Sequence, residues 1–138
     1  MAKKHRPILP TPAELRILQL LWSNGEASVE AVVSAHPPKH RPNYKTTQTI
    51  LRIMEQKGFV SHETRGRVFV YRHLISRENV DRLSVSVLLH QNFRGSRSGL
   101  LLNLLEEGPI EQLELAKMEA MIRECRRRNE NGPPEKGV

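Results

Sequence analysis

The chain has 138 residues, with 22 lysines and arginines against 15 acids and a pI near 10.1. This length allows one domain, or one small domain with an appended unit, and the net charge of +7 favours a polyanionic partner. One cysteine excludes an intrachain disulfide and fits a reducing cytoplasm. No apolar run follows the charged start, so neither a secretory segment nor direct membrane binding is indicated.

The excess positive charge is confined to the first half of the chain. Residues 1–75 hold twelve lysines and arginines against five acids, whereas residues 76–138 hold ten of each. A polyanion is therefore expected to bind residues 1–75.

The first helix is expected to begin at Pro12 and to end before Gly25. Thr11-Pro12-Ala13-Glu14 has the form of a capping box, with proline at the first helical position and glutamate three residues after the cap. A broad apolar face follows, made of Leu15, Ile17, Leu18, Leu21 and Trp22. Asn24-Gly25 is a typical helix end.

A second, shorter helix is expected after Ser28, whose hydroxyl can cap it. Its inward side chains would be Val29, Val32 and Val33. It should end before Pro37-Pro38, because the residue ahead of a proline is pushed out of the α region. A stiff basic loop, His36–Pro42, follows, and its Lys39 and Arg41 either contact phosphate or are simply solvated.

The third helix is expected to begin near Asn43 and to end at Gly58. Its apolar side chains point inward: Ile50, Leu51, Ile53 and Met54. On the opposite side lies a stripe of hydrogen-bonding and cationic side chains: Lys45, Gln48, Thr49, Arg52 and Gln56. Only one acid, Glu55, lies at the border of this polar stripe. The surface suits base edges and phosphates in a groove, although on an isolated helix such a face would more often be merely solvated.

A hairpin is expected directly behind this helix, from Val60 to His73. Gly66 can take the positive φ of a two-residue turn, which we place at Arg65-Gly66. Arg65 and Arg67 flank the turn, where we do not expect them to stabilise the hairpin itself. A helix that leads directly into a hairpin with a cationic tip indicates a winged helix, in which the helix enters one groove of DNA and the wing contacts the adjacent backbone.

Residues 76–128 are expected to form three helices. The first opens at Ser76-Arg77-Glu78, the second is rich in leucine, and the third follows Gly108-Pro109. The leucine-rich helix is apolar on nearly every side and cannot be covered by about 55 residues alone. A second copy in a C2 dimer is the expected cover, and the alternative is that the leucines pack back on the winged helix. The expected interface residues are Val80, Leu83, Val87, Leu100, Leu101, Leu104, Leu105, Leu115, Met118 and Ile122.

The expected fold class is therefore mainly α with a small β-wing. A winged helix-turn-helix DNA-binding domain with a basic N-terminal arm would occupy residues 1–75, a three-helix dimerisation region residues 76–128, and a disordered tail residues 129–138. Two identical winged-helix domains related by a two-fold axis recognise an inverted repeat in double-stranded DNA, which indicates transcriptional control. Two other classes stay open: a protein-interaction module in a larger assembly, and a binder of RNA or of nucleic acid without sequence preference.

Neither a catalytic nor a metal-binding arrangement is present in the sequence. It has no G-x-S-x-G, no H-E-x-x-H and no phosphate-cradling glycine loop, so neither an enzyme nor a cofactor is expected. His36 and His40 are four residues apart, but Pro37-Pro38 prevents them from sharing a helix face. Cys125 is expected to be a small buried hydrophobic residue.

Several of these segments together resemble the penicillinase-repressor family of bacterial winged-helix regulators, whose members control β-lactamase, methicillin-resistance and copper-transport operons. The resemblance covers roughly Leu9 to Arg127. In chain order, the matching pieces are Thr11–Leu15, Leu21-Trp22, Lys45–Thr49, Lys57–Val60, Gly66–Tyr71, Ser76–Glu78 and Leu100–Leu104.

The resemblance implies a repressor that dimerises through its C-terminal helices and binds a promoter palindrome. By position, Lys45, Thr46 and Gln48 would face bases, with Thr49 and Arg52 nearer the phosphates. Some family members are cut at an Asn–Phe bond by a membrane-bound metalloprotease sensor.

The bond that matches this cleavage site is Asn103-Leu104, where leucine stands in place of the aromatic residue. Asn103 has an alternative role, as a polar residue in a buried helix that sets the register of a dimer. The copper-responsive members sense metal through several C-terminal cysteines, and this chain has a single cysteine.

Overall fold

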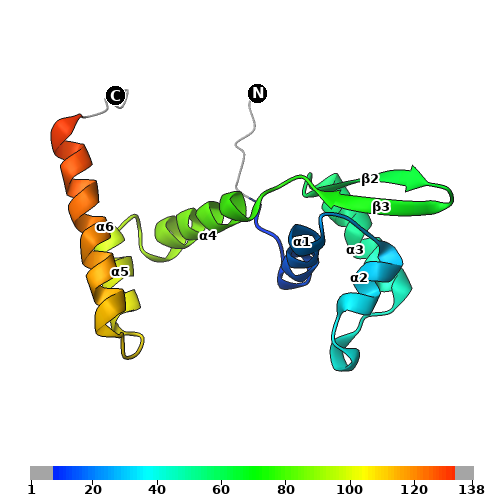
Figure 1. Cartoon of the computed structure of the whole chain (residues 1–138), viewed down its shortest axis with the longest axis horizontal. Helices are drawn as coiled ribbons and strands as arrows, with labels where there is room; N and C mark the ends of the chain where they lie inside the picture. Colours follow the sequence, from blue (N-terminus) through cyan, green and yellow to red (C-terminus); the bar gives the residue numbers. More distant parts are fainter. Residues whose placement is uncertain (1–7, 133–138) are drawn as a thin grey trace. The chain divides into compact units, whose positions relative to one another are not determined.

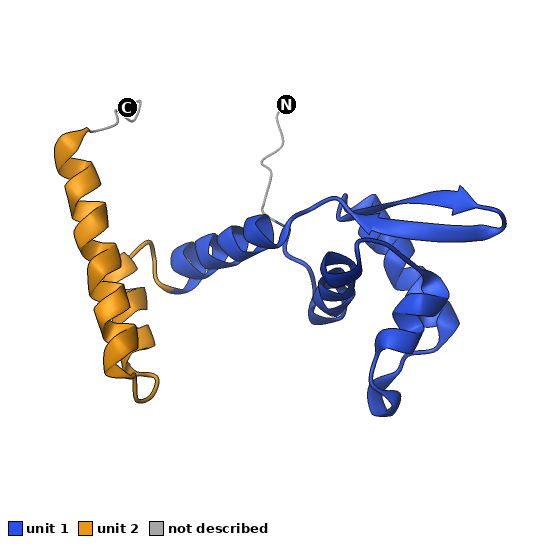
Figure 2. Cartoon of the chain, viewed as in Figure 1, with its two compact units in different colours: residues 1–92 blue, residues 93–138 orange. Residues whose placement is uncertain are grey.

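The computed structural model describes residues 8–132. The expected basic arm at residues 2–6 and residues 133–138 of the expected tail lie outside this range. The chain divides into two compact units, residues 1–92 and residues 93–138 (Figure 1, Figure 2). The first unit therefore includes the helix behind the hairpin, which the sequence assigned to the dimerisation region.

Helix α1, Pro12–Asn24, begins and ends at the residues that the sequence indicated. The Thr11 hydroxyl accepts a hydrogen bond from the Glu14 N–H at 3.2 Å, and the Glu14 carboxylate accepts one from the Thr11 N–H at 3.0 Å. This pair of bonds confirms the capping box. Gly25 closes the helix with a φ of 88°, a value that glycine adopts without strain.

Helix α2, Val29–Ala35, and helix α3, Tyr44–Gln56, are the two helices of the helix-turn-helix (Figure 1). Ser28 caps α2 as expected, and α2 ends before Pro37-Pro38. The connection contains one turn of 3-10 helix, Pro38–His40. Asn43 caps α3, since its side-chain oxygen accepts a hydrogen bond from the Thr46 N–H at 2.7 Å.

The hairpin belongs to a three-stranded antiparallel sheet with the strand order β1-β3-β2. Strands β2, Val60–Arg65, and β3, Val68–His73, form the hairpin, and β1 is only Ala27–Ser28. The turn residues are Gly66 and Arg67, one position later than expected, because Arg65 pairs with Val68. Gly66 has a φ of 66°, and a positive φ at the first turn position suits a two-residue hairpin turn.

One hydrophobic core lies among α1, α2, α3 and the sheet. Its buried residues are Ile17, Leu18, Leu21, Ala27, Val29, Val32, Leu51, Met54, Phe59, Val60 and Tyr71. Trp22 packs at the edge of this core, and its indole N–H donates to the Ile75 carbonyl at 2.9 Å. The Arg77 guanidinium lies 4.8 Å from the centre of the Trp22 ring, so the start of α4, Arg77–Asn92, is fixed against α1.

The second unit contains helices α5, Arg97–Glu106, and α6, Gln112–Asn131 (Figure 2). Ser96 caps α5, with its hydroxyl accepting a hydrogen bond from the Gly99 N–H at 2.9 Å. Helix α6 continues to Asn131, so residues 129–131, which we expected in a disordered tail, are helical.

No described residue of α5 or α6 is buried in the single chain. Of the expected interface residues, Leu104, Leu105 and Ile122 are exposed. Those that are half-buried are Leu83, Val87, Leu100, Leu101, Leu115 and Met118, while Val80 in α4 is buried. Cys125 is exposed, so its predicted burial is wrong for the single chain, because α6 has no apolar cover there.

Candidate nucleic-acid interface

Helix α3 presents its polar stripe to solvent. The side chains of Lys45, Thr46, Gln48, Thr49, Arg52 and Gln56 are all exposed. Leu51 and Met54 are buried beneath them, as expected, but Ile53 is exposed and its predicted inward position is wrong. Thr47 is buried in its place, and its hydroxyl donates to the Asn43 carbonyl at 3.1 Å. A hydroxyl can be buried at this position because the carbonyl one turn earlier accepts its proton.

The end of α3 is fixed to the rest of the unit by one ion pair and one hydrogen bond between side chains. Lys57, which follows the helix, lies 2.8 Å from the Glu14 carboxylate of α1. Glu55 lies 2.8 Å from Nδ1 of His62 in β2. The cap at Asn43 fixes the beginning of the helix, so α3 is held at both ends while its polar stripe stays free for a ligand.

Arg65 does not present a free cation at the wing. Its guanidinium donates to both Glu26 oxygens, at 2.6 and 3.0 Å, and to Glu63 at 2.6 Å. Arg72 donates to the same Glu26 carboxylate at 3.1 Å. We call Glu26, Glu63, Arg65 and Arg72 the wing ion cluster. Our expectation that Arg65 does not stabilise the hairpin is therefore wrong: it joins β2 to the residue before β1.

The wing ion cluster changes the acid–base properties of its members. The hydrogen bond that Arg65 donates to Glu26 lowers the pKa of Glu26, and the same bond raises the pKa of Arg65 above its ordinary value. Arg67, in the turn itself, is exposed and makes no ion pair with any residue in the range 8–132. The free cation at the tip of the wing is therefore Arg67.

The loop before α3 holds the two cations for which the sequence left two roles open. Lys39 is exposed in the 3-10 turn. Arg41 instead donates to backbone carbonyls at the end of α2, to Ser34 at 2.9 Å and to His36 at 3.0 Å. These bonds satisfy carbonyls that a helix end leaves without partners, so Arg41 stabilises the turn of the helix-turn-helix.

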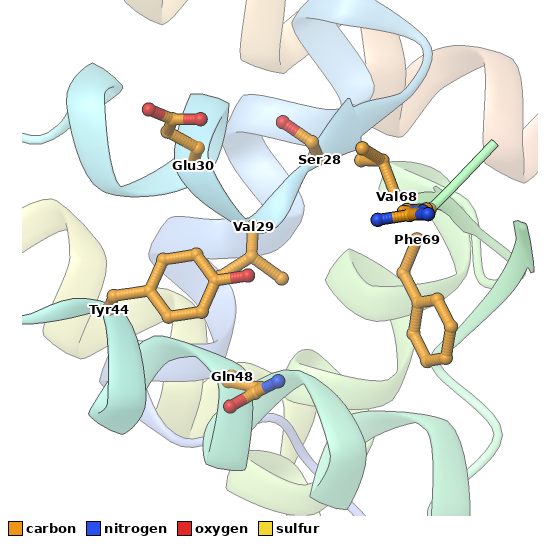
Figure 3. A pocket seen from close by; sticks show the side chains of 8 residues that line it. Ser28, Val29, Glu30, Tyr44, Gln48, Val68 and Phe69 are labelled. Carbon is orange, nitrogen blue, oxygen red and sulfur yellow. The ribbon is translucent and has the colours of Figure 1, made fainter. Parts of the chain in front are cut away.

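A hollow of about 240 Å³ lies between α3, the wing and the start of α2, which lines it with Val29 and Glu30 (Figure 3). Tyr44 and Gln48 line it from α3, Val68 and Phe69 line it from β3, and Arg67 lines it from the turn. Tyr44, Val68 and Phe69 are exposed and were not among the site residues expected from the sequence. The position of Tyr44 directly after the helix cap and beside Lys45 could have indicated a place in the DNA-binding surface.

Residues 8–132 contain no group of three or more histidine, cysteine, aspartate or glutamate side chains that could hold a metal ion. His36 is buried, and its Nδ1 lies 2.8 Å from the Val32 carbonyl. In the same range, no helix is both long enough and apolar enough to span a membrane.

Comparisons with known proteins show the family of this chain. The sequence profile described as "Penicillinase repressor" matches residues 10–124. The penicillinase repressor of Bacillus licheniformis is 25% identical over 116 residues, which cover 84% of this chain and 91% of that protein. The methicillin resistance regulatory protein MecI of Staphylococcus aureus is 19% identical over 110 residues, which cover 80% of this chain and 89% of that protein.

Among solved structures, the DNA-binding domain of the repressor BlaI is 28% identical and gives a TM-score of 0.46. The match covers 54% of this chain and 93% of that domain. The family consists of repressors and not of enzymes, in agreement with the absence of catalytic motifs in the sequence. The chain, matched over residues 10–124, belongs to the penicillinase repressor family of winged-helix, DNA-binding transcriptional repressors.

Proposed function

We propose that this repressor binds an inverted repeat in promoter DNA as a homodimer, with one α3 helix in the major groove of each half-site. The observation that carries the proposal is the polar stripe of α3, which is exposed, free of acids apart from the half-buried Glu55 at its border, and fixed at both helix ends. Lys45, Thr46 and Gln48 would contact base edges, and Thr49 and Arg52 would contact phosphates. Lys39, in the loop before α3, and Arg67, in the turn of the wing after α3, would add phosphate contacts.

Dimerisation is proposed from the second unit. Its helices carry leucine, methionine and isoleucine side chains that stay exposed or half-buried in a single chain. Contiguous exposed apolar residues on a soluble protein mark an interaction surface. A second copy related by a two-fold axis would cover these side chains and place two winged helices on a palindrome.

The test uses the full chain and a duplex recovered by in vitro selection from a random-sequence pool. We expect tight binding by fluorescence anisotropy, a palindromic consensus, and an affinity that falls steeply with salt. Lys45→Ala should lose discrimination between the selected duplex and a scrambled one. Lys117→Ala is the matched control, since it removes an exposed lysine from α6. Binding that is indifferent to sequence, or insensitive to Lys45→Ala, would refute the proposal in favour of a non-specific or protein-binding role.

Relief of repression by proteolysis is proposed for the Asn103-Leu104 bond. Both residues are exposed in the single chain, and no described residue of α5 is buried there. The proposed dimer would cover Leu104, so cleavage requires the interface to open at this helix. The bond lies inside α5, and the Asn103 amide donates to the Gly99 carbonyl at 3.0 Å, so the helix must open locally before a protease can bind the segment in an extended form. Incubation with the cognate membrane metalloprotease sensor, followed by mass spectrometry, should give two fragments divided at this bond. An intact chain would exclude this mode of induction.

A further inference from the structure

The hollow between α3 and the wing has a lining suited to a sugar-phosphate segment (Figure 3). One part of the lining carries polar groups: the Tyr44 hydroxyl, the Gln48 amide and the Arg67 guanidinium. The other part is apolar, made of Val29, Val68 and Phe69, and Ser28 and Glu30 complete the lining. A ligand that fits such a site has an anionic group next to an apolar surface.

Duplex DNA must bring such a segment to this place. When a recognition helix lies in the major groove and a neighbouring element reaches the adjacent minor groove, one strand of the backbone runs between them. This inference rests on the proposed function, since it takes α3 as the recognition helix. We propose that the hollow seats one nucleotide of the DNA backbone, with Tyr44 and Arg67 on its phosphate and Val68 and Phe69 against its deoxyribose.

The state of each group supports this assignment. Arg67 makes no ion pair with a residue of the described range, whereas Arg65, two residues earlier, is held by Glu26 and Glu63. The Tyr44 side chain is 53% exposed, and its hydroxyl is directed across the hollow toward Val29 (Figure 3). A phenolic hydroxyl can donate to a phosphate oxygen without bringing a competing charge.

Phe69 is a prepositioned wall of the hollow. Its ring stacks on the His62 imidazole with the centroids 4.0 Å apart, and that imidazole is bonded to Glu55 of α3 at 2.8 Å. Phe69 nevertheless remains 44% exposed, and Val68 beside it is 49% exposed. Contact with the C–H surface of a deoxyribose would remove this apolar surface from water.

One acid, Glu30, also lines the hollow. Its carboxylate is directed away from Tyr44 and Gln48 (Figure 3), so it does not occupy the position assigned to the phosphate. It would still repel a phosphate at close range, which makes it a second probe of the site. Glu30→Gln should strengthen duplex binding about twofold to threefold at low salt, and the gain should shrink as salt screens the repulsion.

The main test is a double-mutant cycle between the protein and the DNA backbone. The probe is the selected duplex, with neutral methylphosphonates introduced one position at a time. Tyr44→Phe should weaken binding of the unmodified duplex about tenfold, the effect of losing one hydrogen bond to a charged group. At one backbone position the methylphosphonate should weaken wild-type binding by clearly more than it weakens Tyr44→Phe, because both changes remove the Tyr44 bond while the loss of the charge that Arg67 contacts is common to both proteins.

Two further variants separate the phosphate contact from the sugar contact. Arg67→Gln should lower the salt slope by about 0.9, the value for one phosphate, whereas the matched control Arg65→Gln should leave it unchanged. Phe69→Ala should weaken binding without changing the slope, because its contact is apolar. Thermal melting without DNA reports whether each variant is folded, and the exposed Tyr44 hydroxyl can be removed without touching the core.

The outcomes distinguish this inference from the proposed function. If Tyr44→Phe and Arg67→Gln bind like wild type while Lys45→Ala loses sequence discrimination, the hollow does not hold the backbone and the recognition helix stands. If the losses from Tyr44→Phe and from every methylphosphonate are additive, the assignment of Tyr44 to a phosphate is overturned. Absence of duplex binding by the wild-type chain overturns both proposals.

Discussion

The exposed leucines of the second unit give the sharpest prediction about assembly. Leu104 of α5 is 54% exposed in the single chain. Leu104→Ala keeps a good helix former at this position, so α5 should persist while the apolar surface is reduced. We expect this variant to shift the chain from dimer toward monomer.

The size of the effect follows from the exposure of Leu104. Complete burial of a leucine side chain contributes about 1.5 to 3 kcal/mol, so covering the exposed half contributes about 1 kcal/mol in each chain. Truncation also leaves a cavity where the partner packed, which roughly adds a similar amount. Two-fold symmetry counts the substitution twice, which gives a loss of about 4 kcal/mol per dimer. The dimer dissociation constant should then rise by roughly 1000-fold.

Sedimentation equilibrium over a range of protein concentrations measures this constant directly, and circular dichroism checks that helix content is kept. The matched control is Leu74→Ala, which truncates a leucine of similar exposure (60%) in the first unit, between β3 and α4. Leu74→Ala should leave association unchanged. A wild-type chain that stays monomeric at high concentration, or equal effects from both variants, would refute the reasoning.

Three further predictions concern stability within the first unit. Lys57→Met should lower the free energy of unfolding by about 2 kcal/mol in urea denaturation, because Glu14, which is only 4% exposed, would lose its cation. Lys57→Arg should restore most of this stability, and a loss under about 0.5 kcal/mol in Lys57→Met would contradict the prediction. The pKa of Glu26 is lowered mainly by the hydrogen bond from Arg65, so Glu26 stabilises the fold above its unfolded pKa of 4.5 and loses this contribution as pH falls through the folded pKa. Acid unfolding should therefore be steeper in wild type than in Glu26→Gln, and parallel unfolding curves would exclude this role. Burial raises the pKa of Tyr71 above its unfolded value of 10.0, so the contribution of Tyr71 to the stability of the fold is complete below that pH and is lost as pH rises through the folded pKa. Tyr71→Phe should therefore make alkaline unfolding, followed by circular dichroism, less steep. An unchanged alkaline unfolding curve would contradict the assignment.

Local signals in the sequence predicted the helices well. The capping box at Thr11, the cap at Ser28 and the stop at Pro37-Pro38 act within a few residues, and the structure confirms all of them. The first unit could also be predicted as a winged helix, because a helix directly followed by a hairpin has few alternative packings. Strand β1 could not, because a strand of two residues has no periodicity of its own and forms only when β3 offers its edge.

The errors in the candidate site have a common physical cause. Periodicity placed Ile53 inside and left Thr47 unassigned, but which apolar residues of α3 are covered depends on where α1 and the sheet lie. Arg65 was predicted to be free because its partner Glu26 is 39 residues away in sequence. Arg41 was treated as a surface cation because its acceptors are carbonyls, which the sequence does not distinguish. Contacts that form only when the chain folds, local for Arg41 and tertiary for Ile53 and Arg65, decided these positions.

The wing ion cluster bears on how the repressor distinguishes its operator from other DNA. Contacts from cations to phosphates strengthen binding to every sequence alike, so they raise affinity without raising specificity. Glu26 and Glu63 hold Arg65 and Arg72 away from such contacts and leave Arg67 for the backbone. Releasing Arg65 through the double substitution Glu26→Gln/Glu63→Gln should therefore strengthen binding to scrambled duplex at least as much as to the selected duplex, and steepen the salt dependence of both. If binding to the selected duplex alone is strengthened, Arg65 reads the operator and the cluster does not serve specificity by withholding charge.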